Sequence, residues 1–185
     1  MGVADIVVLL LPYLVLATQI ALVLVFLFWL ATKIWKRPFR SAFLDRHRNL
    51  LSLVVAATAT LGSIFFSKVL GYVPCELCWY QRICMYPLAA ILAVATWKRK
   101  DAFAFIAPLL LIGAAFSVYH YNVQFFNVPT FCKAGEVSCA LKGNVAFGYI
   151  TTPLMALTAF AAIFALQALG RGKRKVSEKS RRKRR

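Results

Sequence analysis

Five long apolar segments separated by short polar ones dominate the chain. They cover residues 6–32, 51–70, 79–97, 102–120 and 146–169. Each approaches or exceeds the roughly 20 apolar residues that an α-helix needs to cross a bilayer core. All are too long for membrane β-strands and lack their two-residue alternation, and a helix satisfies its own backbone hydrogen bonds within lipid. The pattern therefore predicts an all-α polytopic membrane protein.

The composition agrees with that class. Of the 185 residues, 61% are hydrophobic, far more than a soluble fold of this size could bury. The first apolar segment does not resemble a cleaved signal peptide, because residues 1–5 carry no basic side chain and the positive cluster of residues 33–40 follows the segment. We expect a permanent anchor whose N-terminus lies outside.

The basic residues alternate between the two sides of the predicted spans. Six of the 23 Lys and Arg fall within residues 33–48, three within 98–100 and ten within 171–185. By the positive-inside rule these segments face the cytoplasm, so the loops 71–78 and 121–145 lie outside and the C-terminus lies inside. The polybasic tail could hold anionic lipid headgroups or contact RNA. Its place beside a span favours the bilayer, and no nucleic-acid partner is expected.

A Cys-x-x-Cys pair lies in the first outer loop, within the stretch PCELCWYQR. Cys78 falls near the first turn of the third helix, where unpaired N–H groups and the helix dipole favour a thiolate. Arg82 lies four residues further on the same helix face, where it could stabilise that thiolate or hold a polar ligand's oxygen. The alternative for Arg82 is a side chain that only extends to the membrane surface.

A second pair, Cys132 and Cys139, lies in the second outer loop within FCKAGEVSC. It could form a disulfide that staples the loop, or one that exchanges with a soluble partner and with the first pair. A zinc site built from all four cysteines is a further alternative, although six intervening residues are unlike the short spacings of structural zinc sites. We expect no metal.

Two further residues attract attention because they lie in apolar spans. His120 ends the fourth span on the outer side, where it could donate a hydrogen bond, carry a proton or have no special task. Cys84 lies within the third span and is expected to be a small core residue without a catalytic role.

The stretch PCELCWYQR resembles the signature of the DsbB-type disulfide-bond formation proteins, including the BdbC-like members of Gram-positive bacteria. The resemblance covers residues 51–169: four spans, a Cys-x-x-Cys in the first outer loop and a second pair in the second. It implies a four-helix transmembrane bundle, from which this chain departs by one additional N-terminal transmembrane helix, residues 6–32. The corresponding regions are residues 1–49 (extra helix and basic loop), 50–169 (redox domain) and 170–185 (disordered cytoplasmic tail).

The resemblance also implies a mechanism in a bacterial cytoplasmic (inner) membrane. The disulfide Cys132–Cys139 would oxidise a DsbA-like thioredoxin-fold protein, and the electrons would pass to Cys75–Cys78 and then to a membrane quinone, either ubiquinone or menaquinone. Arg82 matches the family's quinone-contacting arginine, and His120 resembles a histidine near the quinone.

Two other functions stay open at this stage. Proteins similar to vitamin K epoxide reductase share a four-helix core and could pass electrons in another direction, although they place the loop pair before the Cys-x-x-Cys. A membrane scaffold with structural disulfides would tolerate the loss of Cys78 or Arg82, whereas an oxidase would lose turnover.

Overall fold

The computed structural model describes residues 3–34, 42–126, 128–130, 132, 137–142 and 145–170. Its elements are the helices α1 (Val3–Ile34), α2 (Ala42–Lys68), α3 (Glu76–Trp97), α4 (Phe103–Phe126) and α5 (Thr152–Leu169). All five are long and apolar enough to cross a membrane. The described residues include no strand beyond a single bridge between Ala146 and Ile150, so the predicted all-α membrane fold is confirmed.

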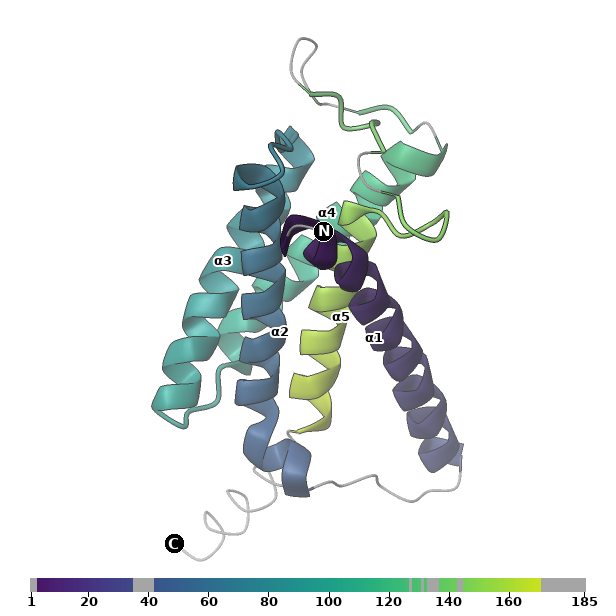
Figure 1. The fold of residues 1–185 in the computed structure, drawn as a ribbon. Helices are drawn as coiled ribbons and strands as arrows, with labels where there is room; N and C mark the ends of the chain where they lie inside the picture. Colours follow the sequence, from purple (N-terminus) through teal and green to yellow (C-terminus); the bar gives the residue numbers. More distant parts are fainter. Residues whose placement is uncertain are drawn as a thin grey trace, which may run out of the picture.

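Helices α2 to α5 form a closed four-helix bundle. Contacts join α2 to α3, α3 to α4, α4 to α5 and α5 back to α2, while α1 packs mainly on α5. Figure 1 shows α1 leaning away from α5 toward its C-terminal end, outside the ring of the other four. The extra N-terminal helix expected from the sequence is therefore present as a separate element on the bundle surface.

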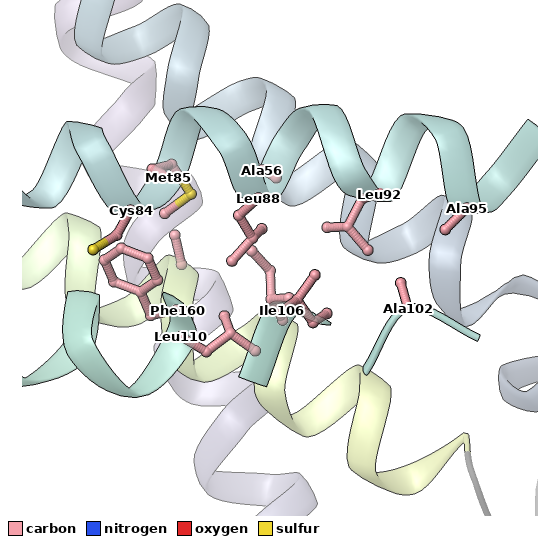
Figure 2. Packing of buried hydrophobic residues seen from close by; sticks show 12 residues of the cluster. Ala56, Cys84, Met85, Leu88, Leu92, Ala95, Ala102, Ile106, Leu110 and Phe160 are labelled. Carbon is pink, nitrogen blue, oxygen red and sulfur yellow. The ribbon is translucent and has the colours of Figure 1, made fainter. Parts of the chain in front are cut away.

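The bundle core consists of apolar side chains from all four helices, with Ala56 contributed by α2. Leu88 and Leu92 of α3 meet Ile106 and Leu110 of α4, and Phe160 of α5 closes the cluster (Figure 2). Phe160 lies directly over Gly113, where a Cβ atom would overlap its ring. Since lipid chains are as apolar as leucine, this close packing stabilises the bundle more than transfer out of water does.

Polar side chains link the helices at the end of the bundle opposite the cysteines. The buried Arg48 lies 3.3 Å from the Asp101 carboxylate in the α3–α4 turn. Gln167 of α5 donates to Asn49 and to Ser52, both at 3.1 Å. Buried polar groups are costly unless paired, so these contacts explain why α2 stays helical through its polar first turns.

Several predicted helix ends need correction. Helix α2 begins nine residues before the expected position 51, because the polar contacts above support its first turns. Helix α4 continues six residues beyond His120, and α5 begins at Thr152 rather than at 146. The residues before α5 turn through Gly148, whose φ is +77°, and Pro153 suits the first helical turn. The tail 171–185 and most of the basic loop 33–41 lie outside the described residues.

Candidate functional site

The Cys-x-x-Cys pair is placed by the end of α2 and the start of α3. Gly71, with a φ of +71°, follows the last turn of α2, and Pro74 then leads the chain into the helix. Cys75 is the N-cap of α3, and Cys78 lies in its first turn. The two free thiols are 2.8 Å apart between their Sγ atoms. A turn of helix therefore holds both sulfurs together beside unpaired backbone N–H groups.

The second pair forms a disulfide. Cys132 and Cys139 are bonded, with their Cα atoms 6.4 Å apart. Cys139 is only 1% exposed, whereas Cys132 is partly exposed. Because both sulfurs are used in this bond, the four-cysteine zinc site considered from the sequence is not formed.

His120 lies between the two cysteine pairs. Its Nε2 atom is 3.7 Å from the Cys75 sulfur and 3.2 Å from the Cys139 carbonyl oxygen, while Gln81 Nε2 lies 3.5 Å from its Nδ1 atom. The Gln81 amide nitrogen can only donate, so Nδ1 accepts and the neutral ring carries its proton on Nε2. At 1% exposure His120 is buried, not at the helix end that the sequence predicted.

The surroundings of Cys75 favour its thiolate. A hydrogen bond from Cys78 lowers the pKa of Cys75 well below the usual cysteine range, against the opposing effect of burial. A hydrogen bond from His120 lowers the pKa of Cys75 further. The thiolate is the reactive form in disulfide exchange, so the pair is prepared for that chemistry.

Arg82 points from α3 toward α2. Its Nε donates to Ser63 Oγ at 2.9 Å, and its Nη2 donates to the Ser63 carbonyl oxygen at 3.0 Å. The guanidinium carbon also lies 5.3 Å from the centroid of the Trp79 ring. These contacts fix the cation within the membrane-spanning part of the bundle, close to the Cys-x-x-Cys.

A cavity of about 740 Å³ opens beside these residues. Cys75, Cys78, Arg82 and His120 contribute to its lining, which is otherwise mostly apolar. Gln124 also lines it, and its Oε1 atom is buried without a hydrogen-bond partner among the described residues. A largely apolar cavity with a few convergent polar groups is typical of a small-molecule site.

The structure brings together all six residues singled out from the sequence. Cys75 and Cys139 share one buried cluster, with Cys78 and Cys132 packed against it, and His120 bridges the pairs. Cys75, Cys78 and His120 also place three potential metal-ligand atoms within 4.8 Å of one another. Cys84 instead packs in the apolar core.

Sequence reasoning missed three polar residues at the site: Ser63, Gln81 and Gln124. Gln81 and Gln124 could have been identified from the sequence, because a side-chain amide in a membrane span needs a hydrogen-bond partner within the protein. Ser63 could not, since its contact with Arg82 depends on how two helices pack.

Comparison with known proteins points to a single family. The model of the disulfide bond formation protein DsbB matches residues 45–171. Disulfide bond formation protein C of Bacillus subtilis is 43% identical over 129 residues, which cover 66% of this chain and 91% of that protein. A probable disulfide formation protein of Oceanobacillus iheyensis is 47% identical and covers 65% and 88%, respectively. One of Chlamydia caviae is 37% identical and covers 72% and 98%. No solved structure matches the chain significantly.

Proposed function

The chain belongs to the DsbB family of disulfide bond formation proteins and is a membrane oxidoreductase that generates disulfide bonds, and we propose a route for its electrons. The route runs from a DsbA-like thioredoxin-fold protein through Cys132–Cys139 to Cys75–Cys78 and then to a membrane quinone. The observation that carries it is the position of His120, which contacts both Cys75 and the Cys139 carbonyl and so places the two pairs at one site.

The first exchange takes place at the loop disulfide. A thiolate of the partner attacks the sulfur of Cys132, the more exposed of the two residues, and Cys139 leaves as a thiolate. The partner's second thiol then displaces Cys132. The partner leaves with a disulfide, and the loop pair holds two electrons and the corresponding protons.

The second exchange transfers these electrons inward. A loop thiolate attacks the oxidised Cys75–Cys78 pair, and completion of the exchange restores the loop disulfide and leaves Cys75 and Cys78 as thiols. The described combination, a loop disulfide with free thiols at Cys75 and Cys78, corresponds to this stage. His120 holds a proton on Nε2 beside the Cys75 sulfur, where it stabilises the thiolate.

The residues around the cavity fit a quinone. A quinone supplies the terminal acceptor of two electrons and two protons. The cavity offers Arg82 as a charged donor for a carbonyl oxygen and apolar walls for a ring, and Cys78 lies on the same face of α3 as Arg82. The family resemblance supports the same assignment.

Membrane location and orientation form part of the proposal. We place the protein in a bacterial cytoplasmic membrane with both cysteine loops outside, where disulfides persist. Residues 50–169 form the redox unit in this scheme, with residues 1–49 as an added helix and basic loop and residues 170–185 as a cytoplasmic tail.

An anaerobic assay with purified protein, a reduced DsbA-like protein and a soluble quinone analogue tests the route. We expect one quinone reduced for each partner disulfide formed, and no turnover with Cys78→Ser. Cys84→Ala is the matched control because Cys84 packs in the apolar core. Normal turnover of Cys78→Ser contradicts the relay. Net reduction of the partner by a quinol would instead support the direction used by vitamin K epoxide reductase-like proteins.

A further inference from the structure

Helix α1 forms part of the cavity that contains the redox site. Leu11, Leu14, Val15 and Thr18 of α1 line the same cavity as Cys78 and Arg82. The match to the DsbB family begins only at residue 45, so this wall comes from outside the family region. On the α3 side the lining extends from Cys75 to Tyr86, roughly 16 Å along a helix at 1.5 Å per residue.

The position of α1 is fixed by specific polar contacts. Gln19 Nε2 donates to Thr158 Oγ1 of α5 at 3.1 Å, and Gln19 Oε1 accepts from the Tyr149 hydroxyl at 3.0 Å. The Tyr13 and Phe147 rings meet edge to face, with centroids 5.2 Å apart. A glutamine within a span is costly unless it is paired, and both ends of this amide are paired. These contacts give α1 a defined position against α5.

The opposite wall of the cavity is built from small and slender side chains. Val55, Ala59 and Gly62 of α2 lie across from α1, and a Cβ atom at Gly62 would lie only 3.6 Å from Leu11 Cδ1. The Leu11 side chain thus extends across the cavity to ordinary van der Waals distance from α2. Met155 and Ala156 of α5 complete an apolar groove that continues from the redox site along the bundle.

We propose that α1 forms one wall of a groove that holds the isoprenoid tail of the quinone. This inference rests on the proposed function, which places the quinone ring near Cys78 and Arg82. The tail is a long apolar chain attached to that ring, and the apolar groove continues from the same point. Transfer of a tail from lipid into this groove yields no hydrophobic gain, so the wall acts through its shape and packing. Helix α1 therefore makes quinone use depend on the tail.

Photolabelling tests the groove without relying on turnover. The probe is a quinone whose isoprenoid tail carries a diazirine, and labelled residues are identified by mass spectrometry of peptides. We expect label on residues 11–18, displaced by an excess of unlabelled long-tail quinone and, because it binds through the ring alone, by a tail-less quinone only at a higher concentration. The absence of label from these residues would overturn the proposal, as would label that long-tail quinone does not displace, the pattern of a lipid-filled groove.

Bulky substitutions on α1 provide the second measurement. Leu14→Trp and Val15→Trp place a large side chain in the groove. Leu24→Trp on the same helix serves as control because Leu24 is about as exposed as Leu14, 61% against 58%, but does not line the cavity. We expect the ratio of kcat/KM for long-tail over tail-less quinone to fall about tenfold in the first two variants and not in the control.

The outcomes separate the two proposals. An unchanged ratio in Leu14→Trp and Val15→Trp overturns the role of α1 while leaving the quinone route intact. If the wild-type protein reduces neither quinone although its cysteines exchange with the partner, the quinone route fails. Displaceable label on residues 11–18 would then still support a tail groove in α1.

Discussion

At the scale of single residues, Ser63 holds Arg82 in place. Its hydroxyl and carbonyl oxygens both accept from the guanidinium. Ser63→Ala removes one of these acceptors, and we expect the KM for quinone to rise about threefold to tenfold, or about 0.7–1.4 kcal/mol. This is less than the roughly 1.5–3 kcal/mol of a full hydrogen bond to a charged group because the bond to the Ser63 carbonyl remains. The kcat for the partner exchange and the KM for the partner should not change.

Two variants distinguish positioning from a general structural effect in that assay. Ser63→Thr keeps the hydroxyl and should restore the wild-type KM for quinone. Thr96→Ala removes a hydroxyl that donates to the Leu92 carbonyl of its own helix, at the far end of α3, and should have no effect on quinone use. A KM increase that Ser63→Thr does not reverse would contradict the positioning role.

The environment of Cys75 predicts a pH dependence. Because its pKa is lowered in the folded reduced protein by Cys78 and then by His120, Cys75 should remain reactive toward iodoacetamide below the pH at which a free cysteine becomes inert. His120→Ala removes one of these causes and should move the alkylation profile to higher pH. Mass spectrometry of the Cys75 peptide across pH measures both profiles, and identical profiles would remove His120 from the stabilisation of the thiolate.

The same shift affects stability, with a sign that follows from linkage. A thiol whose pKa is lower in the folded state stabilises the fold fully above its unfolded pKa, and this contribution is lost as the pH falls through the folded pKa. The reduced protein should therefore gain stability relative to His120→Ala as the pH rises from the acidic range toward the ordinary cysteine pKa. Thermal unfolding of both proteins over that range measures the difference.

The reactive residues of the site could be predicted from the local sequence, whereas the residues that hold them in place could not. Cys75, Cys78 and Arg82 lie within one helical turn or two, so their neighbourhood follows from helix geometry alone. Ser63 reaches Arg82 across nineteen positions, and Gln81 reaches His120 across thirty-nine. Such contacts depend on how helices pack, which one sequence does not determine.

At the scale of helices, hydropathy located the spans but misplaced several of their ends. The beginning of α2 carries charged residues that an apolar pattern excludes, yet Arg48 is buried against Asp101. The reverse holds before α5, where apolar residues 146–150 form a turn because Phe147 and Gly148 both have positive φ angles. Side-chain contacts between helices and the local backbone conformation determine where these helices begin. A hydropathy pattern contains information on neither.

Close packing of α4 on α5 gives a prediction at this scale. Any side chain at Gly113 would collide with the buried Phe160 ring, so Gly113→Val should destabilise the bundle by about 1–3 kcal/mol. Ala115→Val adds a similar volume two residues away at an exposed position and should be neutral. Thermal unfolding in detergent, followed by circular dichroism, compares the two. Equal midpoints would show that α4 and α5 can separate without cost.

At the scale of the whole molecule, one part of the sequence prediction is confirmed and another part stays a prediction. The five spans and the family are confirmed, and the structure places both cysteine pairs at one end of the bundle. Which side of the membrane that end faces stays a prediction, resting on the charge bias of the loops. The contribution of α1 to the cavity wall could not be predicted from the sequence. An apolar helix has the same hydropathy pattern whether it contacts lipid or a ligand groove.

The orientation can be tested with single cysteines introduced into a background in which the five native cysteines are serine. Lys142→Cys lies in the loop near the disulfide, and Lys100→Cys lies in the turn between α3 and α4 at the opposite end. Both positions are exposed, so a membrane-impermeant maleimide can reach either one from its own side. In intact cells we expect label at residue 142 only, with residue 100 labelled after permeabilisation. The reverse pattern would place Cys132–Cys139 in the reducing cytoplasm, where a disulfide exposed to the thiol pool does not persist, and the charge-based topology would have to be inverted.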